Sequence, residues 1–146
     1  MNKKSLFFIV FVSILLISNS CTNDDKTVKP EILIEELGHD NSKVGYAGSD
    51  FHVDAEIVAI NRIDKVRIEI HYEEDHESKS KLVYKNEWEF DLTYTEFSGL
   101  KNVNFHKDLS IPEVARPGIY HFGFSVTDME GNFSLVEEEI EIKQHE

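Results

Sequence analysis

Apolar and polar residues alternate along most of the chain after residue 30. Phe51, Val53, Ala55 and Ile57 share one parity, and the residues between them are mostly polar. The same period of two returns at 66–72 and 120–126. This period, with many β-branched and aromatic residues, predicts strands that bury one face. Helical periodicity is nearly absent after the first 20 residues.

The alternating segments define the expected strands. These cover residues 31–37, 51–59, 63–72, one or two strands within 81–94, then 102–107, 119–127 and 133–143. About seven short strands with frequent turns predict an all-β fold, namely an immunoglobulin-like or fibronectin-like sandwich of two antiparallel sheets. Tyr120, at the start of the sixth segment, is a candidate tyrosine corner. A closed β-barrel is the alternative fold.

The last predicted strand changes parity. Phe133 and Leu135 lie on one parity, whereas Val136, Ile140 and Ile142 lie on the other. A β-bulge near Leu135 would bring both sets to the same face. The many glutamates of this segment suit an edge strand that resists pairing with other chains.

The N-terminal segment has the pattern of an export signal. Two lysines precede a twelve-residue apolar run, Leu6–Ile17, and small residues follow it. The run is shorter than the roughly 20 residues that a membrane-spanning helix needs. We therefore expect a signal peptide with a helical apolar region at 1–20, a flexible acidic tether at 21–29 and one β-sandwich domain at 30–146.

Cys21, the only cysteine of the chain, directly follows this signal. Its position resembles the lipidated cysteine of bacterial lipoproteins, although Ser18 stands where the usual motif has leucine. A lone cysteine cannot form an internal disulfide, and acylation would anchor the domain to a membrane. An incidental cysteine in an ordinary cleaved signal is the alternative. The acidic tether favours the outer membrane, at the cell surface rather than the periplasmic face.

Charge limits the partners of the mature chain. Without residues 1–20 it has 13 basic and 28 acidic residues, a net charge of −15. Nucleic acids and anionic lipids both require positive charge, so neither is an expected ligand of the domain itself. The expected partners are the membrane, through Cys21, and an outer-membrane protein or extracellular ligand.

Several motifs, in order, resemble a family of small Gram-negative lipoproteins with one Ig-like domain of unknown function. They are "GHDN", "GSDFHVDAEI", "IEIH", "GLKNVNFHKDLSIP" and "GIYHFGFSVTDMEGN". The resemblance covers residues 29–142 and implies no established activity. It places histidines of the family pattern at His39, His52, His71, His106 and His121. Where that pattern often has a further histidine, this chain has Asp108.

The sandwich would bring these histidines to one end of the domain. His52 begins one strand and His106 ends its expected antiparallel neighbour; His71 and His121 are related in the same way on the other sheet. Directly opposed residues on neighbouring strands have Cβ atoms roughly 4.5–5.5 Å apart. His39 and His76 lie in loops at the same end, and His145 lies in the tail.

Two imidazoles at this spacing suit Zn²⁺ or Cu²⁺, and carboxylates could complete the shell. The candidates are Asp40, Asp50, Asp54 and Asp108. Because the two pairs face outward from opposite sheets, one ion cannot bridge both outer faces. The site would be one pair with a loop ligand, two sites, or one site at the rim. The alternative is that these histidines are solvated surface residues or structural residues, some of which hydrogen-bond to loop backbones and hold the long connections.

The sequence favours a binding module over an enzyme. It has no nucleophile elbow, phosphate-binding glycine loop or cysteine nucleophile. "HDN", "GSD" and "TDMEGN" offer oxygen ligands for Ca²⁺, but turns explain them equally well. We therefore expect a lipid-anchored envelope module that serves a binding or accessory role. The alternatives are a zinc- or copper-binding lipoprotein and, more weakly, a hydrolase. No cofactor is certain.

Overall fold

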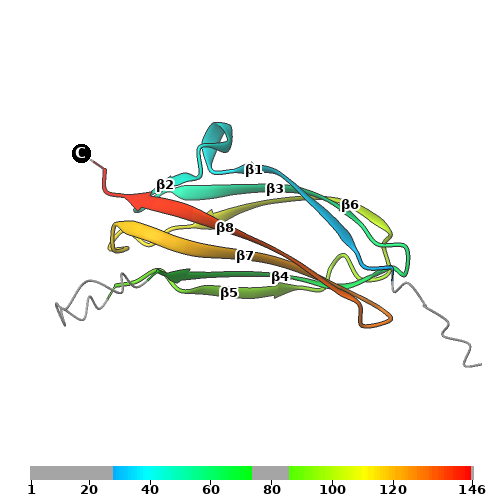
Figure 1. Cartoon of the computed structure of the whole chain (residues 1–146). Helices are drawn as coiled ribbons and strands as arrows, with labels where there is room; N and C mark the ends of the chain where they lie inside the picture. Colours follow the sequence, from blue (N-terminus) through cyan, green and yellow to red (C-terminus); the bar gives the residue numbers. More distant parts are fainter. Residues whose placement is uncertain (1–27, 74–85, 146) are drawn as a thin grey trace, which may run out of the picture.

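The computed structural model describes residues 28–73 and 86–145. In this part of the chain, eight strands and one short 3₁₀ turn form two facing sheets (Figure 1). The elements are β1 (Glu31–Leu37), η1 (His39–Asn41), β2 (Val44–Tyr46), β3 (Asp50–Val58), β4 (Ile63–Tyr72), β5 (Phe90–Tyr94), β6 (Asn102–Ser110), β7 (Gly118–Asp128) and β8 (Phe133–Lys143).

The two sheets have the orders β1-β3-β6 and β2-β8-β7-β4-β5. All neighbours are antiparallel except β2, which runs parallel to the end of β8. The predicted two-sheet sandwich is confirmed, and most strand bounds agree within a residue. Strand β6 extends to Ser110, three residues further than predicted. The segment 81–85 lies outside the described residues, as do residues 1–27 with the predicted signal peptide, Cys21 and most of the tether.

Aromatic and branched side chains from both sheets fill the space between them. Phe51 of β3 and Phe105 of β6 meet Phe122 and Phe124 of β7, with Phe105 and Phe124 ring centroids 5.1 Å apart in an edge-to-face arrangement. All four side chains are almost completely buried. The core consists of every second side chain along the strands. The side chains between them therefore lie on the two outer faces of the sandwich.

Tyr120 forms the predicted tyrosine corner. Its hydroxyl donates a hydrogen bond to the carbonyl of Arg116 (2.7 Å) and accepts one from the backbone N–H of Trp88 (3.3 Å). The ring is fully buried. The corner therefore fixes the connection before β7 and the segment before β5 to the same core residue.

The predicted bulge near Leu135 is wrong. Strands β7 and β8 pair without a register shift from Gly118–Ile142 to Thr127–Phe133. Phe133 and Leu135 are instead exposed on the outer face, while Ile140 and Ile142 are buried. Strand β8 is also not a simple edge, because β2 covers its last residues.

Strand β2, which the sequence analysis missed, begins after a strained loop. Asp40, Asn41 and Lys43 all have positive φ angles, between 53° and 56°. Asn41 Oδ1 accepts a hydrogen bond from the backbone N–H of Leu37, and the N–H of Gly38 donates to the carbonyl of His52. These bonds hold the loop next to the first residues of β3.

Candidate metal centre

The outer face of the three-stranded sheet carries two histidines and two aspartates in alternation. On β3, His52 and Asp54 point outward between the buried Phe51, Val53 and Ala55. The register pairs His52 with Asp108 and Asp54 with His106. These four outward side chains, which we call the His–Asp quartet, are His52, Asp54, His106 and Asp108.

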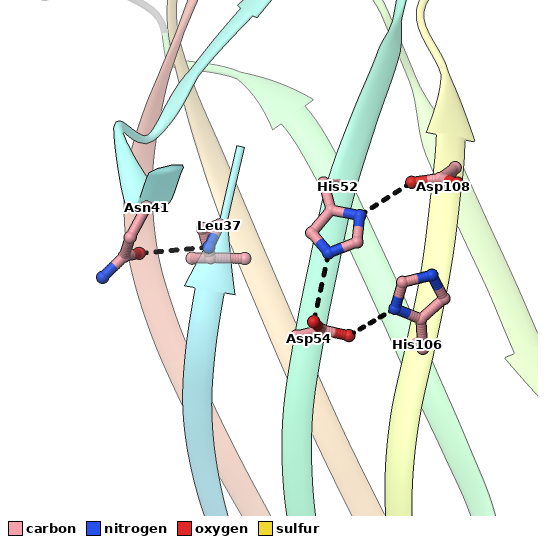
Figure 2. A network of polar contacts seen from close by, with 6 residues as sticks. All are labelled: Leu37, Asn41, His52, Asp54, His106 and Asp108. Atoms are coloured by element: carbon pink, nitrogen blue, oxygen red, sulfur yellow. Dashed lines mark hydrogen bonds and ion pairs between the residues drawn. The ribbon is translucent and has the colours of Figure 1, made fainter. Parts of the chain in front are cut away.

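Asp54 contacts both imidazoles of the quartet (Figure 2). Its Oδ1 lies 2.7 Å from His106 Nδ1, and its Oδ2 lies 3.1 Å from His52 Nε2. The second nitrogen of His52, Nδ1, lies 2.8 Å from Asp108 Oδ1. The centroids of the two imidazole rings are 4.6 Å apart. The two histidines are therefore close, but they are diagonal neighbours. The prediction that they lie directly opposite each other is wrong.

These contacts favour the charged forms of His52 and Asp54. The hydrogen bond with Asp108 is the main cause of a raised pKa at His52; partial burial opposes it and Asp54 adds to it. Burial alone would raise the pKa of Asp54. Hydrogen bonds from His52 and His106, with their charges, outweigh burial, so the pKa of Asp54 is lowered. An imidazole between two carboxylates therefore keeps its proton to a higher pH than a free imidazole when no metal is bound.

A fifth side chain, Glu36, joins the same face through a β-bulge. The register between β1 and β3 shifts between Ile34 and Glu36, which places Glu36 opposite Asp54. Ligand atoms of Glu36, His52 and Asp54 all lie within 4.8 Å of one another. Glu36 was not among the residues predicted from the sequence, although the three-residue spacing between the inward residues Ile34 and Leu37 indicates an extra residue in the strand.

The quartet fits a transition metal through three of its members. Ligand atoms of His52, His106 and Asp108 lie within 4.8 Å of one another, and His106 and Asp108 are exposed. Tetrahedral zinc ligands lie about 3.4 Å apart, given metal–ligand distances of about 2.1 Å. Rotation of exposed side chains can close this difference. The donor set of two imidazoles and one carboxylate suits Zn²⁺ and Cu²⁺.

The other predicted pair, His71 and His121, faces outward from the five-stranded sheet. The two residues are directly opposite, with ring centroids 4.9 Å apart. His121 Nε2 lies 3.2 Å from Glu137 Oε1, whereas its Nδ1 is buried and has no hydrogen-bond partner among the residues that the structure describes. Among residues 28–73 and 86–145, no three-ligand group that could hold an ion includes this pair.

Of the remaining histidines, His39 and His145 are not brought into either pair. His39 is exposed in η1, and its Nε2 lies 3.4 Å from Asp40 Oδ2. His145 stacks on Tyr46, with ring centroids 5.2 Å apart. His76 lies outside the described residues. Asp40 and Asp50 are absent from the candidate ligand groups of the described chain.

Asp128, in the segment that offered calcium ligands, has a structural role in the β7–β8 turn. Its carboxylate is buried and accepts hydrogen bonds from the backbone N–H groups of Glu130 and Asn132 and from the side-chain amides of Asn132 and Asn61. Burial alone would raise the pKa of Asp128, but these bonds outweigh it and the pKa is lowered. The turn therefore explains this aspartate without an ion.

Comparisons with known proteins agree with the fold. The chain belongs to the family described as Domain of unknown function (DUF4625), which matches residues 19–143. A search of curated proteins found no match. The chain resembles the crystal structure of wild-type OgpA from Akkermansia muciniphila with a TM-score of 0.52 and 9% identity. The similarity covers 79% of this chain and only 29% of OgpA, so it supports the fold alone.

The described residues contain no helix that is long and apolar enough to span a membrane.

Proposed function

We propose that this protein is a lipid-anchored cell-envelope module that binds Zn²⁺ or Cu²⁺ through His52, His106 and Asp108. The observation that carries this proposal is the contact of Asp54 with both imidazoles, at 2.7 Å and 3.1 Å. The proposed role is binding and not catalysis. Two histidines and a carboxylate on neighbouring strands would supply three protein ligands and leave the ion open to solvent.

Asp54 would orient the two histidines. Its oxygens accept hydrogen bonds from one nitrogen of each ring, namely Nε2 of His52 and Nδ1 of His106. The nitrogens left for an ion are Nδ1 of His52, beside Asp108, and Nε2 of His106. A carboxylate that accepts the second N–H of a metal-bound histidine fixes the ring and raises its basicity.

The position of Cys21 supports an anchor. It is the only cysteine and directly follows a segment with the pattern of an export signal. We propose that Cys21 carries the lipid and that the domain lies at the outer membrane, on the cell surface. The partner that receives or supplies the ion would be an outer-membrane protein or an extracellular ligand.

Titration of the full acylated protein with zinc and copper tests the metal site. We expect wild type to bind one of these ions more tightly than about 10 μM, or roughly 7 kcal/mol. His52→Ala should weaken this binding by about 100-fold, since it removes a ligand. His71→Ala, which removes the histidine of the other sheet, is the matched control and should change it less than about twofold.

A wild-type protein that binds neither ion at this level would overturn the metal proposal. Equal losses in His52→Ala and His71→Ala would instead place the site elsewhere.

A further inference from the structure

One end of the sandwich exposes several large apolar side chains. The connections β3–β4 (59–62), β5–β6 (95–101) and β7–β8 (129–132) all lie at the end where the described chain begins, on the right in Figure 1. Each connection carries one exposed apolar residue. These residues, which we call the apolar tip, are Ile60 (60% exposed), Leu100 (49%) and Met129 (52%).

Hydrogen bonds join the three connections into one unit. The N–H of Met129 donates to the carbonyl of Arg62 (2.9 Å), and the N–H of Ile63 donates to the carbonyl of Leu100 (2.8 Å). Arg62 Nη1 also lies 3.4 Å from the carbonyl of Gly99. The apolar side chains are therefore presented together on a fixed backbone.

The tether reaches the domain at this same end. Asn61 Nδ2 donates a hydrogen bond to the carbonyl of Val28 (3.4 Å), next to Ile60. Val28 is itself exposed. Val28 is seven positions after Cys21, so that even a fully extended chain keeps the two within about 25 Å. A lipid on Cys21 would hold the apolar tip near the membrane.

The tip lacks the negative charge of the rest of the protein. Its three connections contain Arg62 and Lys101 against Glu96 and Glu130, a net charge of zero, whereas the whole chain has −13. This end is therefore not repelled by anionic headgroups as an acidic surface would be. Exposed apolar side chains on a neutral surface can enter the boundary between headgroups and acyl chains.

We propose that the apolar tip inserts into the membrane leaflet that holds the lipid of Cys21. This inference rests on the proposed anchor. It gives the domain an orientation: the His–Asp quartet, near the start of β3 and the end of β6, lies toward the opposite end and faces away from the membrane.

Site-specific fluorescence on the full acylated protein tests this orientation. Acylation blocks Cys21, so Met129→Cys provides one free thiol for an environment-sensitive fluorophore. The protein is reconstituted in vesicles of phosphatidylethanolamine and phosphatidylglycerol that contain a headgroup-labelled quencher lipid. We expect strong quenching at residue 129. Val114→Cys is the matched control, since Val114 is 63% exposed on the β6–β7 connection at the other end; it should remain unquenched.

A second variant tests whether the apolar contact is the cause. Ile60→Asp combined with Leu100→Asp should abolish quenching at residue 129 while the protein stays folded by circular dichroism and membrane-bound. Quenching that persists in this variant, or that is equal at residues 129 and 114, would overturn the insertion. Mass spectrometry separates the two proposals: an unmodified Cys21 refutes the anchor and with it the insertion, whereas an acylated protein without quenching refutes the insertion alone.

Discussion

The His52–His106 pair and the His71–His121 pair lie on opposite outer faces of one sandwich, and their rings are almost equally close, 4.6 Å and 4.9 Å apart. Their surroundings differ. The first pair shares Asp54 and adjoins Asp108 and Glu36. Among the described residues, the second pair has one contact with a glutamate, Glu137, and one buried ring nitrogen without a partner. Proximity of two histidines is therefore not enough for a metal site. The groups that orient the rings and offer further ligands distinguish the pairs.

The largest expected effect comes from the residue that orients both rings of the first pair. Asp54→Asn keeps the size of the side chain but removes its charge and one acceptor oxygen. We expect zinc affinity to fall about 10- to 100-fold, the usual loss for such a partner of metal-bound histidines. Glu137→Gln, the matched change beside His121, should alter affinity less than about twofold. Calorimetric titration measures both.

An Asp54→Asn variant with wild-type affinity would mean that His52 and His106 need no orienting carboxylate. The contrast between the two pairs would then rest on Asp108 and Glu36 alone.

A smaller effect should follow from giving the second pair a carboxylate. Ile119 lies two residues before His121 on the same outward parity of β7, and it is exposed. In a His52→Ala background, Ile119→Asp should restore zinc binding by about tenfold, because it adds a hard oxygen ligand beside two imidazoles. Ile119→Asn controls for the change in shape. A variant no better than this control would show that ring placement limits the second pair.

The smallest expected effect concerns the metal-free quartet. The raised pKa of His52 means that its contribution to stability is complete below the unfolded value of 6.5 and disappears as the pH rises through the folded pKa. The lowered pKa of Asp54 gives a contribution that is present above 3.8 and disappears as the pH falls through its folded pKa. Both contributions therefore coexist between these two values.

His52→Gln should accordingly lower the free energy of unfolding by about 0.5–1 kcal/mol near pH 5.5, and by less near pH 8.5. Denaturant unfolding in the presence of a chelator measures this difference. An equal cost at both pH values would indicate that the imidazole stabilises the sheet by packing and not by charge.

The sequence predicted much of the fold because the parity of the strands is regular. Phe51 to Ile57 and Tyr120 to Val126 alternate without interruption, and their buried faces are those expected. The prediction of buried faces failed where the apolar residues of a strand change from one parity to the other. The bulge predicted at Leu135 required this apolar residue to be buried, whereas it is exposed on the outer face of β8. The bulge at Glu36 was not predicted. Strand β2 has three residues around Gly45, too few to show any period.

The candidate site was predictable only in outline. Antiparallel order places the start of β3 beside the end of β6, so the sequence was sufficient to bring His52 and His106 into the same neighbourhood. The sequence was not sufficient to predict the register of β3 and β6. His52 lies opposite Asp108, and this pairing depends on a strand β6 that continues to Ser110. The contacts within the His–Asp quartet follow from that register and from the side-chain rotamers. The local sequence pattern determines neither of them.

The pairing of β1 with β3 has a mechanical consequence. The chain enters the domain at the start of β1, and the ladder hydrogen bonds to β3 run across the strand direction. A force applied to residue 28 along β1 would load these hydrogen bonds in shear, so that many of them must break together before β1 separates from β3. The short β2 then passes to the other sheet and runs beside the end of β8. Tension applied at the N-terminal side would thus be shared by both layers of the sandwich.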